Sequence, residues 1–180
     1  MPRILRNTAI LAKVETTYKT DAVPTGAANA LLVSNMSITP LNAQNVNRDL
    51  VRGYFGGSDQ LVGTSNVQTS FDVELAGSGA AGTAPAWGAL LQACGYAEVV
   101  TSGQRVEYTP VSTGIKSVTI YYYLDGTLHK LIGARGTFQL RADMQTGRPV
   151  ISFSFTGLDG GIAAAANPAM ALAAWKTPVA

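Results

Sequence analysis

Few side chains in this sequence could act as an acid, a base or a nucleophile. The single histidine, His129, lies in the middle of Thr127 to Leu131, a run expected to form a strand. It could serve as a general base, but no serine or cysteine in a recognisable nucleophile motif lies near it. The single cysteine, Cys94, falls on the apolar side of an expected helix, where it acts best as a small hydrophobic residue. The sequence therefore predicts no catalytic site.

Sites for metals, phosphates and bases are equally poor. The sequence has no Cys/His cluster and no acidic loop with calcium spacing. Gly77 to Gly82 is glycine-rich, but it lacks both the Gly-Lys-Ser/Thr ending of a P-loop and the dinucleotide fingerprint. Tyr121, Tyr122 and Tyr123 do not form a platform of three rings, because Tyr122 faces away from the other two on a strand. We expect no cofactor and no metal.

The charge content points to a subunit that other subunits cover. Of 180 residues, 47% are hydrophobic but only 13% are charged, about half the usual share. A soluble monomer normally carries more surface charge. The net charge of +2 is too small to favour nucleic-acid binding by a basic surface, and one cysteine excludes a disulfide framework. No run is long enough to cross a membrane, so we expect a protein made in the cytoplasm that stays soluble until it assembles.

The elements that would position side chains are mostly strands. Asn66 to Ala76 and Val150 to Gly157 alternate apolar and polar residues, which predicts strands with one buried face. Val118 to Leu124, Asp125-Gly126 and Thr127 to Leu131 predict a hairpin, since both turn positions need a positive φ. With Thr137 to Ala142, these runs predict an antiparallel meander. The fold class is mainly β: two packed antiparallel sheets, a sandwich or barrel, with one flanking helix.

One helix is predicted from Pro85 to Cys94. Thr83 can cap it, Pro85 suits its first turn, and Gly95 can end it. Trp87, Leu90, Leu91 and Cys94 have the spacing of a single helix face.

The remaining segments divide the single domain, 1–180, into parts. Residues 1–30 are expected to hold an N-terminal arm and the first strand, and residues 66–160 the β core. Residues 40–65 lack a sustained period yet carry large apolar residues, which predicts a long loop that docks on something. Residues 161–180 are alanine-rich, and predict either a frayed helix or an extended arm that lies against a surface through Trp175.

Several stretches, in order along most of the chain, resemble the major tail tube proteins of long-tailed (siphovirus-type) bacteriophages. They are Leu11–Tyr18, Thr20–Thr25, Ile38–Leu41, Val46–Arg52, Glu74–Gly79, Gly82–Gly95, Tyr108–Ser112 and Gly133–Gly136. One departure is Lys19, where the resemblance would place glycine, and the C-terminal end matches least well. The resemblance implies a structural protein of the virion tail that forms stacked hexameric rings, a hollow conduit for the viral genome. It also implies that the loop and the terminal arms reach neighbouring subunits and rings, and it favours a sheathless tail.

A tube of this kind would have a polar lining. Duplex DNA carries one negative charge per about 1.7 Å, so a basic lining would bind it and stall its passage. We expect the polar strand faces to turn inward, although alternation alone leaves open that they form the outer solvent face. The candidates are Gln68, Ser70, Asp72, Glu74, Gln139, Arg141, Ser152 and Ser154, with Asp143 and Thr156 beside them.

Contacts between subunits are expected in the loop, because Tyr and Arg are typical interface anchors. The candidates are Arg48, Asp49, Arg52, Tyr54 and Phe55; the alternative is a surface loop that folds back on its own domain. The expected partners are copies of this chain, tape measure, tail terminator and tail tip proteins, and DNA that passes without specific binding.

Other functions stay open. A tail terminator or a decoration protein could share the fold without forming long tubes. A carbohydrate-binding sandwich would need a coplanar row of aromatic rings, and a small hydrolase would need a triad built on His129.

Overall fold

The computed structural model describes residues 6–48, 50–51, 53, 56–142 and 148–178. The described chain is mainly β, with one short helix, as the sequence predicts. In chain order the elements are β1 (Thr8–Val14), β2 (Ala30–Leu31), β3 (Ser34–Asn47), β4 (Gln60–Glu74), α1 (Gly88–Ala93), β5 (Tyr96–Thr101), β6 (Arg105–Pro110), β7 (Val118–Leu124), β8 (Thr127–Ala142) and β9 (Pro149–Ala164).

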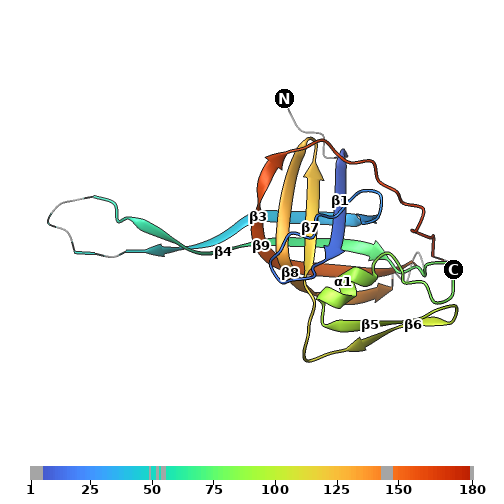
Figure 1. Cartoon of the computed structure of the whole chain (residues 1–180). Coiled ribbons are helices and arrows are strands. Elements are labelled where there is room, and N and C mark those ends of the chain that lie inside the picture. Colours follow the sequence, from blue (N-terminus) through green and yellow to red (C-terminus); the bar gives the residue numbers. More distant parts are fainter. Residues whose placement is uncertain (1–5, 49, 52, 54–55, 143–147, 179–180) are drawn as a thin grey trace.

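Seven strands form one antiparallel sheet that folds over on itself. Their order is β2-β1-β7-β8-β9-β4-β3, and β5 and β6 form a separate two-stranded sheet. Figure 1 shows β1 and β7 running across the direction of β3 and β4. β8 and β9 are long enough to belong to both halves, and their ladder shifts register on either side of Leu131 and Ile132. The expected two packed sheets are therefore two halves of one sheet, which bulges in the β8–β9 ladder bend over on itself.

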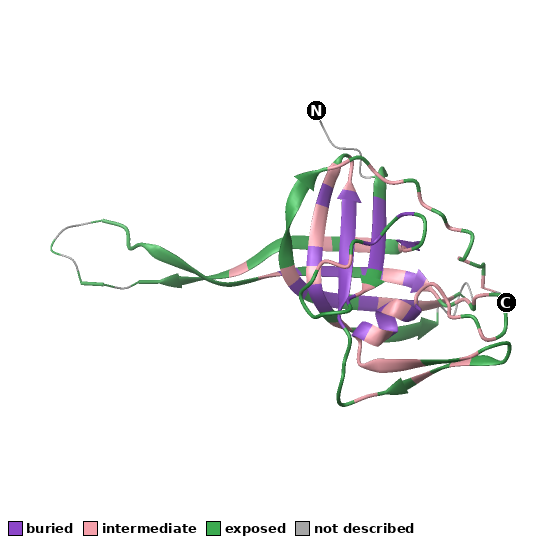
Figure 2. Cartoon of the chain, in the orientation of Figure 1, coloured by how far each residue is buried: buried purple, intermediate pink, exposed green. Residues whose placement is uncertain are grey.

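The hydrophobic core lies between the two halves. Phe71 of β4 stacks on Phe155 of β9, with ring centroids 5.9 Å apart, and Ile120 of β7 and Leu131 of β8 belong to the same cluster. All four side chains are at most 1% exposed. In Figure 2 the buried residues gather on the central strands of the body. This confirms the predicted inward faces of the strands around residues 67–73 and 151–155, where burial of alternate aromatic residues stabilises the sheet.

The meander β7-β8-β9 forms as the sequence predicts. Leu124 pairs with Thr127, so the turn holds only Asp125 and Gly126, whose φ angles are +43° and +85°. Both values lie in the left-handed region that the Asp-Gly pair adopts readily. Met144 to Gly147, the turn expected between β8 and β9, lies outside the described residues.

Helix α1 is shorter than the predicted span. It runs from Gly88 to Ala93 with Trp87 at its N-cap position, and no side chain caps it, so Thr83 does not act as the cap. The Gly88 amide donates to the carbonyl of Pro85, which makes the preceding residues a turn. Gly95, at φ +89°, ends the helix as expected. Leu90 and Leu91 are buried, while Trp87 and Cys94 pack against the core from its rim.

Within the segment 40–65, residues 40–47 and 60–65 are the outer strands of a long hairpin. β3 and β4 stay paired out to Asn47 and Gln60, and Figure 1 shows this hairpin projecting far from the body. The ladder contains three register shifts, which interrupt the alternation that would have indicated strands. The prediction of a loop was wrong for residues 40–47 and 60–65, because these projecting strands bury neither face in the subunit and so show no alternation.

The C-terminal arm lies against its own domain. β9 continues to Ala164, and residues 165–178 then run without helix or strand. The Trp175 indole donates to the Ala30 carbonyl at 2.9 Å, and the Ala171 amide donates to the Gly26 carbonyl at 2.9 Å. Of the two predicted conformations, the extended arm is correct, and Trp175 packs against the core as expected.

A buried carboxylate joins three parts of the fold. Glu15 follows β1 and is only 3% exposed. Its oxygens accept hydrogen bonds from the hydroxyls of Ser117 (2.6 Å) and Thr119 (2.8 Å). They also accept hydrogen bonds from the backbone amides of Gly133 (2.7 Å) and Lys19 (3.0 Å). Lys19 has a φ of +66°, so the position where the resemblance would place glycine does adopt a left-handed conformation.

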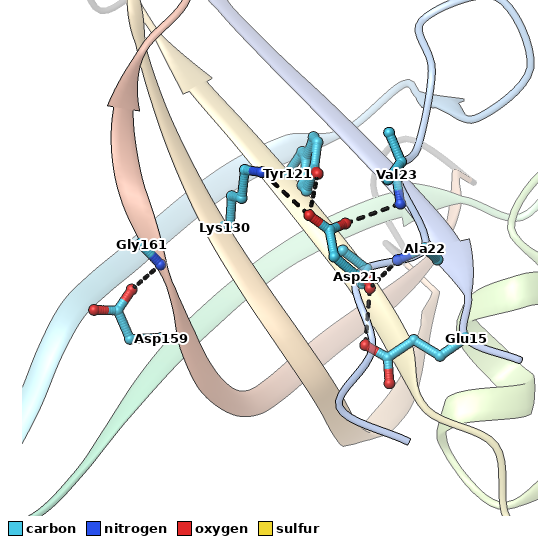
Figure 3. Close-up of polar contacts among 9 residues, drawn as sticks. Glu15, Asp21, Ala22, Val23, Tyr121, Lys130, Asp159 and Gly161 are labelled. Carbon is cyan, nitrogen blue, oxygen red and sulfur yellow. Dashed lines mark hydrogen bonds and ion pairs between the residues drawn. The ribbon is translucent and has the colours of Figure 1, made fainter. Parts of the chain in front are cut away.

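A second polar cluster holds the loop after β1 to β7 and β8. Asp21 accepts hydrogen bonds from the Tyr121 hydroxyl (2.5 Å), Lys130 Nζ (3.1 Å) and the Val23 amide (2.8 Å). Figure 3 shows these groups converging on the carboxylate. Partial burial favours a higher pKa for Asp21, but the hydrogen bonds and the Lys130 charge outweigh it and hold the pKa below 3.8.

We expect Asp21→Asn to lower the free energy of unfolding by about 1.5 kcal/mol at neutral pH, because it removes a charged acceptor. A folded-state pKa below the unfolded value stabilises the fold above pH 3.8, and this contribution is lost as the pH falls through the folded pKa. Urea unfolding at a series of pH values measures both effects. The difference between the wild type and the variant should shrink under acid; a constant difference would contradict the role of the ionised carboxylate.

Candidate functional site

The side chains that could act in catalysis or stacking are packed within the fold. His129 packs its ring against Tyr122, with centroids 5.9 Å apart. Burial raises the pKa of the Cys94 thiol to about 12, which disfavours the reactive thiolate. Tyr121, Tyr122 and Tyr123 are each less than 10% exposed, so they offer no stacking platform. Among the described residues, no group of three His, Cys, Asp or Glu side chains is placed to hold a metal ion, and no helix there is long and apolar enough to span a membrane.

The expected channel-facing residues share one face of the sheet half β8-β9-β4-β3. Cross-strand pairing places Gln139 and Asp72 on either side of Ser152, and Ser70 opposite Ser154. A shallow depression of about 430 Å³ is lined by polar side chains from all four strands. The face also includes residues that were not predicted from the sequence: Asn35, Ser37 and Thr39 of β3, and Thr137 of β8. Asp143 lies outside the described residues.

Several charged side chains on this polar face have polar partners on the same face. Arg148 Nη1 lies 3.1 Å from Glu74 Oε1, and both Arg141 Nε and Nη2 donate to Gln139 Oε1 at 3.3 Å. The Asn35 amide donates to Asp72 Oδ2 at 2.8 Å. Partial burial favours a higher pKa for Asp72, but the nearby Ser152 and Asn35 groups and the two arginine charges outweigh it and lower the pKa below 3.8.

The same sheet half has two open edges. The ladder between β7 and β8 ends at Val118 and Ala134, so within the described chain Arg135–Ala142 pairs only with β9. On the other side, β3 is the last strand of the sheet. An open edge presents unpaired backbone groups that can pair with another chain. This unit of four strands can therefore extend in both directions.

The projecting hairpin carries exposed apolar side chains. Leu41, Val46, Leu61 and Val62 are each more than half exposed. Arg48, a predicted contact residue, is exposed beside them. The other four predicted contacts, Asp49, Arg52, Tyr54 and Phe55, lie outside the described residues. Isolated exposed apolar residues are ordinary, but a two-stranded projection that carries several of them is typical of an interaction surface.

Comparison with known proteins assigns the family. The model of the phage tail tube protein family matches residues 6–180. No curated protein sequence matches the chain. The fold is similar to the tube-terminating cap of the anti-feeding prophage, with a TM-score of 0.51, 10% identity, and coverage of 92% of this chain and 93% of that one. It is also similar to a chain of the sheath–tube complex of an extracellular contractile injection system in its extended state, with a TM-score of 0.55, 8% identity, and coverage of 91% and 92%.

These two structures share the fold, and the family match extends over nearly the whole chain. The family is structural and not enzymatic, in line with the absence of a predicted catalytic site. The chain belongs to the phage tail tube protein family.

Proposed function

We propose that this chain polymerises as stacked hexameric rings into a hollow tube through which the viral genome passes. The observation that carries the proposal is the sheet half β8-β9-β4-β3, which has a polar face and an open edge on each side. Six copies joined edge to edge would give a barrel of about 24 strands. With a strand spacing of about 4.8 Å and a tilt of about 40°, its backbone diameter is about 48 Å, enough for side chains and duplex DNA.

The polar face is the one that would line the channel. Its eight sequence-predicted members, together with Asn35, Ser37, Thr39 and Thr137, provide hydroxyls, amides and paired charges, and the opposite face of β4 and β9 packs into the core. The polar face is therefore a hydrated surface on which the described cations have partners. DNA would pass over it without specific contacts.

The projecting hairpin would join subunits of neighbouring rings, with Arg48 and the undescribed Asp49, Arg52, Tyr54 and Phe55 among its contacts. Its exposed apolar residues are the support for this assignment. We further propose a sheathless tail with tape measure, terminator and tip proteins as partners, as the resemblance to long-tailed phages implies. A tail terminator is the second candidate function, because one of the similar structures is a tube-terminating cap.

Negative-stain electron microscopy of the purified chain tests the proposal. We expect long hollow tubes, whereas a terminator would give closed single rings. A chain that stays monomeric at high concentration and is missing from the tail shaft of the virion would contradict both functions.

The edge pairing has its own test in Leu140→Lys. Leu140 lies on the open edge of β8 and is 62% exposed, so the substitution should leave the subunit folded. A lysine on an edge strand opposes the addition of another strand. We expect tubes to be lost from micrographs, while Val99→Lys, at a 50% exposed position on β5, should still form them. Equal assembly by the two variants would rule out the β8 edge as a contact.

A further inference from the structure

Among its described residues, the polar face carries more arginines than carboxylates. Its described charged side chains are three arginines, Arg135, Arg141 and Arg148, and two carboxylates, Asp72 and Glu74. Six copies around a channel would repeat these arginines in every ring. Free arginines at this density would bind the phosphates of passing DNA, and each contact would make the binding tighter at low salt.

Each arginine has a partner that limits its availability. Arg148 forms an ion pair with Glu74 at 3.1 Å. Arg141 is held by Gln139, and both Arg141 and Asp72 line the same depression. In the ladder, Arg141 and Glu74 flank the same residue of β9, Val150, so the two arginines and two carboxylates form one group. Arg135 lies apart, with its guanidinium over the Tyr18 ring at 4.9 Å.

The Arg148–Glu74 ion pair contributes little to folding. In the Arg148–Glu74 pair the side chains are 50% and 37% exposed, and exposed ion pairs contribute at most about 1 kcal/mol to stability. The position of Glu74 therefore needs an explanation other than stability.

We propose that Asp72 and Glu74 neutralise Arg141 and Arg148, and that this neutralisation keeps the channel face from binding DNA. The inference rests on the proposed function, because it assigns the polar face to the channel. On this view, Asp72 and Glu74 decide whether the channel face releases or retains a polyanion. The arginines in turn keep the face from becoming strongly acidic, since their charges balance those of the carboxylates.

The test uses the full chain with Leu140→Lys, which is expected to stay unassembled and so leaves the polar face accessible, and a short fluorescein-labelled DNA duplex. The wild-type reference and every variant below carry this substitution. Fluorescence anisotropy should show that Asp72→Asn/Glu74→Gln binds the duplex at least about tenfold more tightly than the wild type at low salt. The double variant leaves Arg141 and Arg148 without their carboxylates. The slope of log K against log salt concentration should therefore become more negative by about 2. Adding Arg141→Gln and Arg148→Gln should return binding to the wild-type level.

The matched control is Glu107→Gln. Glu107 pairs with Arg105 at 2.8 Å on the β5–β6 hairpin, so the variant releases an arginine outside the polar face. We expect it to bind DNA no more tightly than the wild type. Equal binding by the control and the double variant, or no gain by the double variant, overturns the inference. Tube formation by the wild type is measured separately, so a failure of the proposed function can be told apart from a failure of this one.

Discussion

A subunit whose hairpin is cut back to Asn42 and Asn66 should fold normally and form no tubes. These two residues face each other in the β3–β4 ladder, so a two-residue Asn-Gly turn can replace residues 43–65. Apart from the half-buried Ala43, every described residue in the removed segment is exposed. The free energy of unfolding should therefore change by no more than about 0.5 kcal/mol. Circular dichroism and urea unfolding measure the fold, and negative-stain microscopy measures assembly.

Point variants separate the apolar surface of the hairpin from its length. Leu61→Ser with Val62→Ser removes two side chains that are 53% and 70% exposed, and we expect shorter or fewer tubes. Thr64→Ser, a small change on the same strand, should assemble like the wild type. Tubes of normal length from the truncated chain would show that the hairpin does not join subunits.

The sequence predicts best those parts of the fold whose signals are local and whose faces are buried within one copy. The meander β7-β8-β9 follows from the Asp125-Gly126 turn and from the alternation of Ile151, Phe153 and Phe155. Each of these signals depends only on neighbouring residues. Burial of one face then fixes the register, because a slip of one residue would expose all three side chains.

The parts that the sequence did not predict depend on distant contacts or on none within the subunit. The hairpin segment buries neither face, and the register shifts of β3 disturb its period, so no alternation reveals it. The fold of the sheet depends on bulges in β8 and β9, where Gly133 has a φ of +61°. Single-residue irregularities of this kind leave a weak trace in a sequence.

The candidate site shows the same division. Strand alternation was enough to place Ser70, Ser152 and Gln139 on a common face, because paired strands keep their alternate sides aligned. β3 was missed although Ser37 and Thr39 alternate with Met36 and Ile38. That signal was available, but it is short and ends at Pro40. The arginine–carboxylate partners could not be predicted, since they come from β4, from β8 and from the residue before β9.

The structural role of Glu15 could not be predicted from the sequence. In the sequence it only interrupts an apolar stretch, while its two hydroxyl donors are more than 100 residues away. Figure 3 shows it on the loop after β1, close to the Asp21 cluster. Thr119 connects the two clusters, because its hydroxyl donates to Glu15 and accepts the amide of Ala22 at 3.1 Å.

Glu15→Ala should destabilise the fold by about 3–5 kcal/mol, more than the loss expected for Asp21→Asn. The change would leave four buried or half-buried donors, two hydroxyls and the amides of Lys19 and Gly133, without their acceptor. Each buried donor left unsatisfied costs about 1–3 kcal/mol, although the hydroxyls can rotate to other acceptors. Urea unfolding followed by tryptophan fluorescence measures the loss.

Glu15→Gln separates the carboxylate from the space it fills. Glutamine keeps the size and one acceptor oxygen but turns an NH2 group toward two of the donors, so we expect an intermediate loss of about 2 kcal/mol. Glu107→Gln, at an exposed ion pair, should change stability by less than about 0.5 kcal/mol. Because the bulge at Gly133 bends β8 between the two sheet halves, the Glu15 variants should also form tubes poorly at temperatures where they remain folded. If Glu15→Ala were as stable as Glu107→Gln, the four hydrogen bonds would not hold the bend, and β8 would owe its shape to core packing alone.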